Sequence, residues 1–449
     1  MSDSDPSRRG RRTLIALLAV VALLAAGCGT TTPSTSPSTV VAATPTPTVP
    51  PPTPNASARP GASTGPGASS SPNAEFEAIY DAVERQVIAI CGLKPSRAVE
   101  RQLIDATELR AMITKLFDEK TPPAYLAAND RLLKALALIP STSNLRDLSL
   151  DLLSGGVAAF YRDDEGKLYV VSKTGKLGAT ERFYFAHEFD HALQDQNSTI
   201  FKDQEGILDQ SDRLLARQAV YEGDATLLMT QWAAANLSPS DFTDLLASAS
   251  DPDAQAVLAR TPAILRETLT FPYTTGLGYV SSVQVDGGWP AVNAHFKAMP
   301  ASTEQILHPE KYTAGEAPVA VTMPADLATR LGTGWSVPLQ DTFGEYQMGL
   351  WLREGGVAKA KATAAAAGWG GDRLAVMEGP DGAWVVAMQT VWDTTADAAE
   401  FEAAATTAIE KAGGAAQVLP GVGGKTRWVV IGSDAYALGH VANVLELAG

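Results

Sequence analysis

Residues 28–73, which are dominated by threonine, proline, serine, alanine and glycine, divide the chain into a short leader and a long body. This stretch holds no aromatic residue and almost no charge. A segment of this composition buries too little apolar surface to offset the entropy that it loses on ordering. We therefore predict a disordered tether over residues 28–73, so that any fold must be built from the residues after it.

The leader, residues 1–27, has the pattern of a signal for export. Four arginines precede an apolar stretch, residues 13–26, which is shorter than the roughly 20 residues that span a bilayer. Small residues and Cys28 follow, as in bacterial lipoprotein signals, although Ala25 stands where leucine is usual. We expect palmitate-type acylation of Cys28 and an extracytoplasmic body anchored to the cell membrane by lipid. The alternative is an ordinary secretory signal and a secreted protein.

Composition and charge narrow the classes of function. The formal net charge of the chain is −15, whereas a nucleic-acid binder needs a basic surface, so we predict no nucleic-acid partner. The only two cysteines are Cys28 and Cys91, which excludes a disulfide framework and a cysteine-based zinc finger. With 45% hydrophobic residues the body can form a sizeable core. No feature of the sequence indicates an oligomeric state.

Local patterns predict an α+β body in two parts. Residues 75–155 have helical periodicity, and residues 157–172 have the pattern of a β-hairpin. Residues 356–449 are predicted to form a separate C-terminal unit of the type ββαββα, an antiparallel sheet with helices on one face. Its expected strands and helices are, in chain order, 372–378, 383–391, 396–412, 416–419, 426–432 and 434–447.

Residues 187–191, His-Glu-Phe-Asp-His, form the pattern H-E-x-x-H. We predict a helix from about Glu181, with Thr180 as its N-cap. Histidines four residues apart lie on one face of a helix, so both imidazoles can bind one ion. Zinc accepts neutral imidazole and a tetrahedral site with one open position. Glu188 lies close enough to contact water at that position and is the expected general base.

Helical periodicity supports this placement of the motif. Phe185 and Phe189 fall four residues apart and predict a buried stripe, while His187 and His191 leave the opposite side of the helix. Asp195, four residues after the second histidine, is expected to orient its free ring nitrogen. The alternative is a chance occurrence of the pattern on a solvated face.

A third ligand is expected from a second helix, residues 210–236. Glu222 and Asp224 lie there in the sequence VYEGDATLLM. A carboxylate in such an apolar helix is costly unless it is paired or bound to a metal. We predict Glu222 as the third ligand of one Zn²⁺ ion and Asp224 as a supporting carboxylate. The reverse assignment and an exposed acidic face are the alternatives.

With H-E-x-x-H and a later glutamate, the chain resembles zinc metallopeptidases of the zincin fold, of the gluzincin type. AHEFDHALQDQ followed by YEGDATLL is similar to a group of bacterial exported or lipid-anchored metallopeptidases, and the similarity extends over most of residues 75–395. Gln194 and Asn197 depart from the metzincin pattern, which has glycine and histidine there. Thr226 stands where thermolysin-like enzymes carry an aspartate.

The resemblance implies a mostly helical metallopeptidase domain over residues 74–355, with a small β-hairpin or sheet. It implies hydrolysis of a peptide or protein substrate by water activated at the zinc ion. The hairpin strand, residues 168–172, would border the cleft and pair with extended substrate. The transition-state oxyanion needs a further donor, for which His308, Tyr312 and Tyr273 are the candidates.

Two other functions stay open at this point. One is a non-enzymatic surface binding or scaffold lipoprotein that retains the zincin fold. The other is a zinc hydrolase that acts on cell-wall peptides. The presence of Glu188 favours an enzyme, because zinc binding alone does not require that residue.

Overall fold

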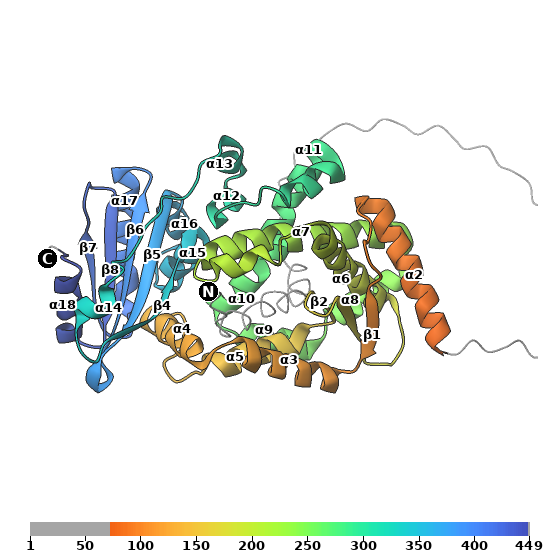
Figure 1. Cartoon of the computed structure of the whole chain (residues 1–449), viewed down its shortest axis with the longest axis horizontal. Coiled ribbons are helices and arrows are strands. Elements are labelled where there is room, and N and C mark those ends of the chain that lie inside the picture. The colour runs from red at the N-terminus through yellow and green to blue at the C-terminus, as the bar shows by residue number, and fades with distance from the viewer. Residues whose placement is uncertain (1–71, 448–449) are drawn as a thin grey trace, which may run out of the picture.

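A computed structural model of the protein describes residues 72–447. The predicted α+β class is confirmed: most of these residues are helical, and the strands form one three-stranded and one five-stranded sheet. Figure 1 shows the two sheets toward opposite ends of the molecule with most of the helices between them. The predicted acylation site Cys28 and nearly all of the predicted tether lie outside the described residues, and the first helix of the described part begins at Pro72.

The elements have the following bounds. The strands are β1 (Glu100–Ile104), β2 (Ala159–Arg162), β3 (Lys167–Val171), β4 (Ser336–Asp341), β5 (Trp369–Glu378), β6 (Trp384–Trp392), β7 (Ala415–Pro420) and β8 (Thr426–Gly432). The helices of the first part are α2 (Pro72–Cys91), α3 (Ala106–Lys120), α4 (Pro123–Ala135), α5 (Leu145–Gly156), α6 (Ala179–Asn197), α7 (Ser211–Asn236), α8 (Pro239–Ala249), α9 (Pro252–Arg260), α10 (Ala263–Phe271) and α11 (Leu277–His295). Those that follow are α12 (Thr303–Leu307), α13 (Pro309–Ala314), α14 (Leu327–Leu331), α15 (Gly344–Glu354), α16 (Lys359–Ala366), α17 (Thr395–Ala408) and α18 (Ala435–Val444). Short π- or 3₁₀-helical segments are η3 (Asp203–Ile207), η4 (Pro272–Gly276), η5 (Pro380–Gly382) and η6 (Ile409–Lys411).

The small sheet has the strand order β1-β3-β2. The predicted hairpin is present as β2 and β3, which pair antiparallel. Strand β1 pairs parallel with β3 and falls within residues 75–155, which were expected to be wholly helical, so that expectation is wrong here. Parallel strands need a long connection, so β1 pairs with a strand that lies far along the chain. The sequence around β1 therefore contains no hairpin pattern that would predict the strand.

Helix α6 begins at Ala179, two residues before the predicted start at Glu181, so the predicted N-cap Thr180 lies inside the helix. The cap is Gly178, whose N–H donates to the Glu181 carboxylate at 2.9 Å. This bond satisfies one backbone donor of the first turn and draws the helix start back to residue 179. The predicted apolar stripe is buried: Phe185 and Phe189 are fully covered, and Phe185 packs on Tyr80 of α2 with ring centroids 4.5 Å apart.

The large sheet has the order β4-β5-β6-β8-β7, and all its strand pairs are antiparallel. The four strands and two helices predicted for the C-terminal unit are all present. The fifth strand, β4, lies before residue 356 and pairs along β5, with Leu339 opposite Val376. The sheet therefore includes residues that precede residue 356, the predicted start of the C-terminal unit.

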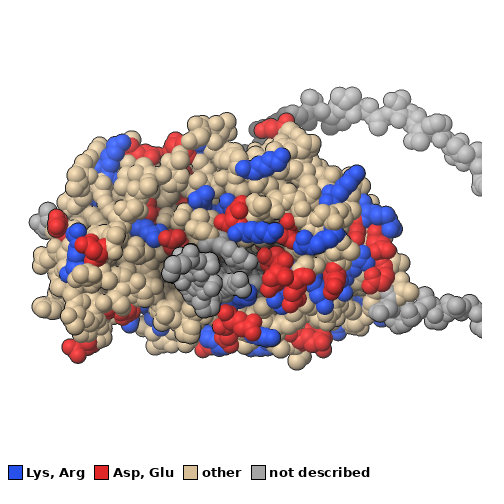
Figure 2. Space-filling model, in the orientation of Figure 1, with Lys and Arg blue, Asp and Glu red and all other residues tan. Residues whose placement is uncertain are grey.

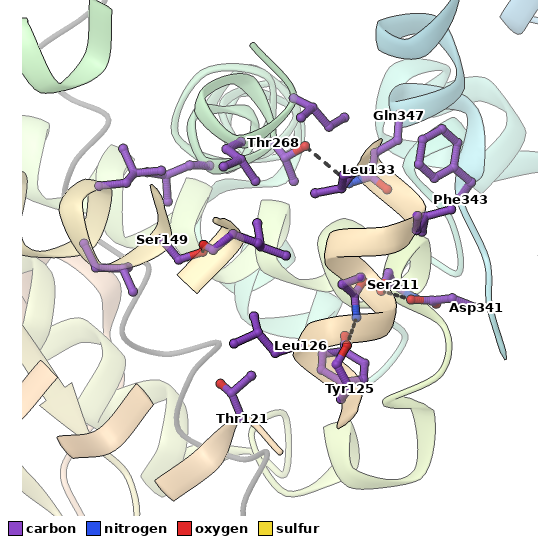
Figure 3. A pocket seen from close by; sticks show the side chains of 18 of the residues that line it. Thr121, Tyr125, Leu126, Leu133, Ser149, Ser211, Thr268, Asp341, Phe343 and Gln347 are labelled. Carbon is purple, nitrogen blue, oxygen red and sulfur yellow. Dashed lines mark hydrogen bonds between the residues drawn. The ribbon is translucent and has the colours of Figure 1, made fainter. Parts of the chain in front are cut away.

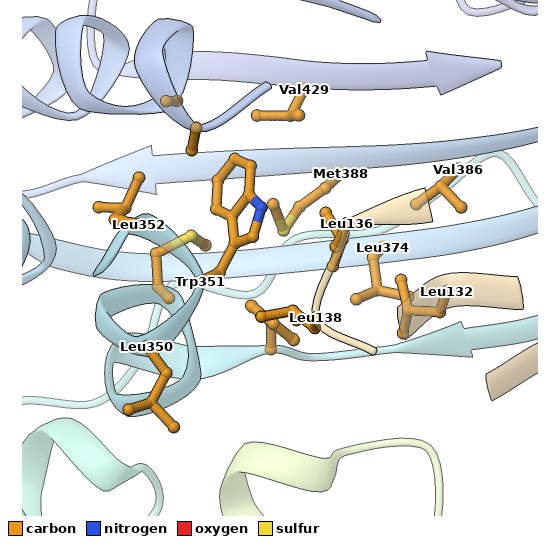
Figure 4. Packing of buried hydrophobic residues seen from close by; sticks show 14 of the residues in the cluster. Leu132, Leu136, Leu138, Leu350, Trp351, Leu352, Leu374, Val386, Met388 and Val429 are labelled. Atoms are coloured by element: carbon orange, nitrogen blue, oxygen red, sulfur yellow. The ribbon is translucent and has the colours of Figure 1, made fainter. Parts of the chain in front are cut away.

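Helices cover both faces of the large sheet, so the prediction of helices on one face is wrong. On one face Met388 and Val429 pack against Trp351 of α15 (Figure 4). On the other face Ala387 and Val430 belong to a cluster with Leu438 of α18. Strands β5, β6 and β8 are apolar on both sides, and each apolar face of a sheet must be covered by another layer.

Helix α7 is the element on which the two ends of the molecule meet. It contacts α6 and α11, and also α12 and α15. Figure 1 shows it crossing the centre of the molecule, and most of its residues are buried.

Acidic and basic side chains are interspersed over the face seen in Figure 2. Within residues 72–447, no helix combines the length and the apolar character that crossing a membrane requires.

Candidate metal centre

Helices α6 and α7 bring two histidines and one glutamate to a common point. The Nε2 atoms of His187 and His191 lie 3.1 Å apart. Oε2 of Glu222 lies 3.1 Å from the first of these nitrogens and 3.2 Å from the second. All three side chains are buried, with exposures of 0–4%. The predicted ligand set therefore converges in space, although its members lie 31 and 35 residues apart across the two helices.

The triangle of donor atoms fits a tetrahedral zinc ion. Zinc bonds of about 2.0–2.1 Å to nitrogen and oxygen require ligand atoms roughly 3.3 Å apart at the edges of a tetrahedron. The observed edges of 3.1–3.2 Å are close to that value. The donor set, two imidazoles and one carboxylate, leaves the fourth corner open, as in catalytic rather than structural zinc sites. The residues thus fit the ion that the sequence predicts.

Gln194 fixes the proton position on His191. The Nε2 group of Gln194 faces only acceptors, namely Asp190 Oδ2, Asp224 Oδ2 and the Tyr221 carbonyl, at 3.0, 2.8 and 3.0 Å. Its Oε1 must then face His191 Nδ1, 2.9 Å away, which donates to it. A neutral imidazole with its proton on Nδ1 presents the lone pair of Nε2, the atom that points to the candidate metal position.

Asp190 and Asp224 form a buried pair of acids behind this glutamine. Both are at most 1% exposed. Burial raises the pKa of Asp224 well above its usual range, and the neighbouring Asp190 carboxylate raises it further. Two carboxylates in contact away from water cannot both ionise, so the pair holds one proton. Asp224 thus contacts Gln194, which contacts His191, so its predicted supporting role would act through the glutamine.

Asp195 does not orient His191, so that prediction is wrong. Its carboxylate instead accepts from the Tyr161 hydroxyl at 2.8 Å and from Arg97 at 2.7 Å. The histidine is satisfied by Gln194, three residues along the helix. A helix turn has 3.6 residues, so the position three residues on is as close as the position four residues on, and spacing alone does not separate them.

Glu188 lies beside the ligands and in contact with strand β2. Its Oε2 accepts the backbone N–H of Tyr161 at 2.9 Å. Its Oε1 is buried and has no hydrogen-bond partner in the described part of the chain. Burial raises the pKa of Glu188 to about 8. The backbone and the hydroxyl of Tyr161 together hold β2 against α6 at two points, Glu188 and Asp195.

The two histidines respond differently to their surroundings. Burial lowers the pKa of His187. Burial alone would also lower the pKa of His191, but the adjacent Glu222 carboxylate raises it to about 10. The same contact acts in reverse on Glu222: burial opposes its charge, and the two imidazoles nevertheless hold its pKa below the usual value.

Of the three candidates for an oxyanion donor, only Tyr273 lies at the centre. Its ring centroid is 6.2 Å from that of His187, and burial, followed by the charge on Glu222, raises its pKa well above the usual value. His308 pairs with Glu345 of α15 at 2.9 Å. The Tyr312 hydroxyl donates to the Ala298 carbonyl. His308 is therefore part of another cluster, and its predicted role at the metal centre is not supported.

Three site residues were missed by sequence reasoning. Gln194 was used only to exclude a metzincin, although a polar residue three positions after a ligand histidine is within reach of its ring. Tyr161 acts through its backbone N–H, and no residue type signals such a contact. Asp190 lies inside the motif itself, and its burial follows from the full covering of α6 on all sides.

Comparisons with known proteins bear on the C-terminal unit. Residues 329–443 match the family described as Domain of unknown function (DUF8575). The matched range includes all five strands of the large sheet, and it excludes α6 and α7, which carry the candidate metal centre. No curated protein and no solved structure matches the chain.

Proposed function

We propose that the protein is a zinc metallopeptidase that hydrolyses peptide bonds with a glutamate as general base. The observation that carries the proposal is the convergence of His187, His191 and Glu222 within 3.2 Å, with Glu188 beside them. A chance motif on a solvated helix face does not bury its histidines, and it does not meet a carboxylate from another helix.

The residues of the chain have separate tasks in this proposal. Bound zinc would supply Lewis acidity toward a peptide carbonyl and would lower the pKa of a water molecule. Glu188 would serve as the general base through Oε1, the oxygen that has no hydrogen-bond partner among the described residues, and would carry the proton to the leaving amine. Tyr161 holds the other oxygen. Tyr273 is the expected donor to the oxyanion.

Strand β2, not β3, is the proposed docking edge for substrate. The resemblance implied that residues 168–172 border the cleft, but β3 is the central strand and has both edges paired. Strand β2 is an edge of the sheet and reaches Glu188 through Tyr161. Strand β2 lies against α6, so an extended peptide would pair with it by β-augmentation only after the two elements separate.

The burial of the ligands favours one other candidate, a scaffold protein with a structural zinc ion. Exposures of 0–4% leave no path for a polypeptide to the centre as described. An enzyme must therefore separate β2 from α6 to admit substrate, at the cost of the Tyr161–Glu188 and Tyr161–Asp195 bonds. A scaffold needs no such movement, and it needs no Glu188.

Metal analysis combined with peptide hydrolysis tests the proposal. The full chain should bind one zinc ion, and His191→Ala and Glu222→Ala should lose it. His295→Ala, which removes a histidine hydrogen-bonded to Tyr279, is the matched control and should retain zinc. Glu188→Gln should retain zinc while cleavage of a mixed peptide library falls by at least about 100-fold. Zinc binding without cleavage by the wild type would leave the scaffold function, and absence of zinc would refute both.

We also propose that the protein is exported and anchored by acylated Cys28. Metabolic labelling with a palmitate analogue tests this proposal in cells. The wild type should incorporate the label and fractionate with membranes, and Cys28→Ala should lose both properties. Label that persists in the variant contradicts anchoring at this residue.

A further inference from the structure

An apolar cavity lies between the helical body and the C-terminal unit. Its volume is about 280 Å³. Its walls come from α3, α4, α5, α7 and α10 on one side, and from β4, β5 and α15 with the segment before it on the other. Figure 3 shows the side chains around it, with Thr121 and Leu126 toward one end and Thr268 and Gln347 toward the other. It is separate from the metal centre, none of whose ligands lines it.

The wall is built to receive an uncharged, mostly hydrocarbon ligand. Leucine, isoleucine and phenylalanine side chains make up more than half of the lining residues. Among the described residues that line it, only Asp341 is charged. That carboxylate is already engaged by the N–H and hydroxyl of Ser211 and by the N–H of Thr342. A charged head group would therefore lose its hydration without gaining a counter-charge.

One polar group in the wall lacks a partner. Thr121 is 7% exposed, and within residues 72–447 its hydroxyl has no hydrogen-bond partner. Its backbone N–H is used to close helix α3 on the Phe117 carbonyl. A buried polar group without a partner destabilises the fold, and a ligand hydroxyl or carbonyl would recover part of that cost. The other polar side chains shown in Figure 3, such as Ser149 and Gln347, are already hydrogen-bonded.

From these observations we infer that the cavity binds a single-chain, uncharged amphiphile of about ten carbon atoms. Its hydroxyl or carbonyl group contacts Thr121, and its hydrocarbon chain runs along the aliphatic wall. A dry cavity of about 150 Å³ holds benzene, so 280 Å³ has room for roughly ten to twelve heavy atoms. The inference goes beyond peptide hydrolysis and does not require zinc.

A series of straight-chain 1-alkanols tests the inference by isothermal titration calorimetry on the full chain. Each buried CH₂ contributes about 0.8 kcal/mol, so the affinity should rise about fourfold per carbon from hexanol to decanol. The rise should stop near dodecanol, when the cavity is full. Decanoate, with a charged head group, should bind at least about tenfold more weakly than 1-decanol.

Two substitutions locate the ligand. Ser149→Phe places a ring in the cavity and should abolish binding. Ser154→Phe is the matched control, because Ser154 lies on the same helix and makes the same bond to the carbonyl four residues back, but does not line the cavity. Thr121→Val should lower the affinity of every alkanol about three- to tenfold and leave the dependence on chain length unchanged.

Several results would overturn the inference. They are an affinity that does not depend on chain length, a rise that continues well beyond dodecanol, and equal binding of decanoate and decanol. Wild-type binding by folded Ser149→Phe would do the same. If that variant does not fold, Thr121→Val decides, and an unchanged affinity for alkanols then refutes the proposed contact.

Discussion

Replacing Gln194 by leucine separates the orientation of His191 from the ligands themselves. Leucine has a similar volume and removes two functions of the amide. It removes the acceptor of His191 Nδ1, and it removes the donor that faces Asp190 and Asp224. The ligands His187, His191 and Glu222 stay in the sequence. Any change in zinc affinity therefore comes from a residue that does not touch the ion.

The contacts of Gln194 set the expected magnitude. Loss of the partner of a ligand histidine typically lowers metal affinity by 10–100-fold, which is about 1.4–2.7 kcal/mol. The buried acceptors left behind on Asp190 and Asp224 destabilise the fold separately, by about 1–3 kcal/mol. The first effect appears only with zinc, and the second appears with or without it.

Zinc affinity is measured by competition with a chromophoric chelator, and stability by urea unfolding with and without EDTA. Gln196→Leu is the matched control on the same helix. Gln196 accepts from the backbone of Ser96 and Arg97 and makes no contact with His191. The control should keep the zinc affinity of the wild type.

The reasoning is refuted if folded Gln194→Leu binds zinc as tightly as the wild type. It is also refuted if Gln194→Leu and Gln196→Leu lose zinc affinity equally. In the first case the packing of α6 alone orients the imidazole. In the second case the loss comes from the helix as a whole and not from the bond to Nδ1.

Two further predictions concern stability. A Cβ at Gly223 would lie 2.5 Å from the Gly276 carbonyl, so Gly223→Ala should lower the unfolding free energy by about 1–3 kcal/mol. The control Gly278→Ala, whose Cβ would meet nothing within 4 Å, should leave the unfolding free energy unchanged. Equal urea midpoints for the two variants would contradict the close packing of α7 on η4. The Glu345 carboxylate raises the pKa of His308, so the pair stabilises the fold below pH 6.5 and this contribution is lost as pH rises through the higher folded pKa. Solvent screening keeps the contribution of this ion pair below about 1 kcal/mol. The unfolding free energies of the wild type and His308→Gln should differ at low pH, and the difference should disappear at high pH.

Local pattern was sufficient for the elements whose partners lie nearby in sequence. The β2–β3, β5–β6 and β7–β8 pairs are joined by short connections, and their apolar alternation predicts them. Helix α6 followed from its periodicity. By contrast, helices separate β1 from β3 and β4 from β5 along the chain, and nothing in the residues of β1 or β4 specifies those partners.

In the candidate site, too, local sequence predicts some residues and tertiary contacts determine the others. His187, Glu188 and His191 are fixed by one helix, and Glu222 was selected because a carboxylate in an apolar helix needs a partner. The role expected of Asp195 went to Gln194, since two neighbouring positions on a helix reach the same ring. The contact of Tyr161 with Glu188 depends on how a strand backbone sits against α6, which only tertiary structure determines.

The bond between Asp341 and Ser211 makes the beginning of α7 depend on the large sheet. Ser211 opens the helix that carries Glu222, and the carboxylate that holds its first turn stands at the end of β4. A chain truncated before residue 336 would leave that turn without its partner, eleven residues upstream of the acid that faces the two imidazoles. The region matched as a domain of unknown function thus contacts the first turn of the helix that carries Glu222, and a chain shortened to α6 and α7 should lose that contact.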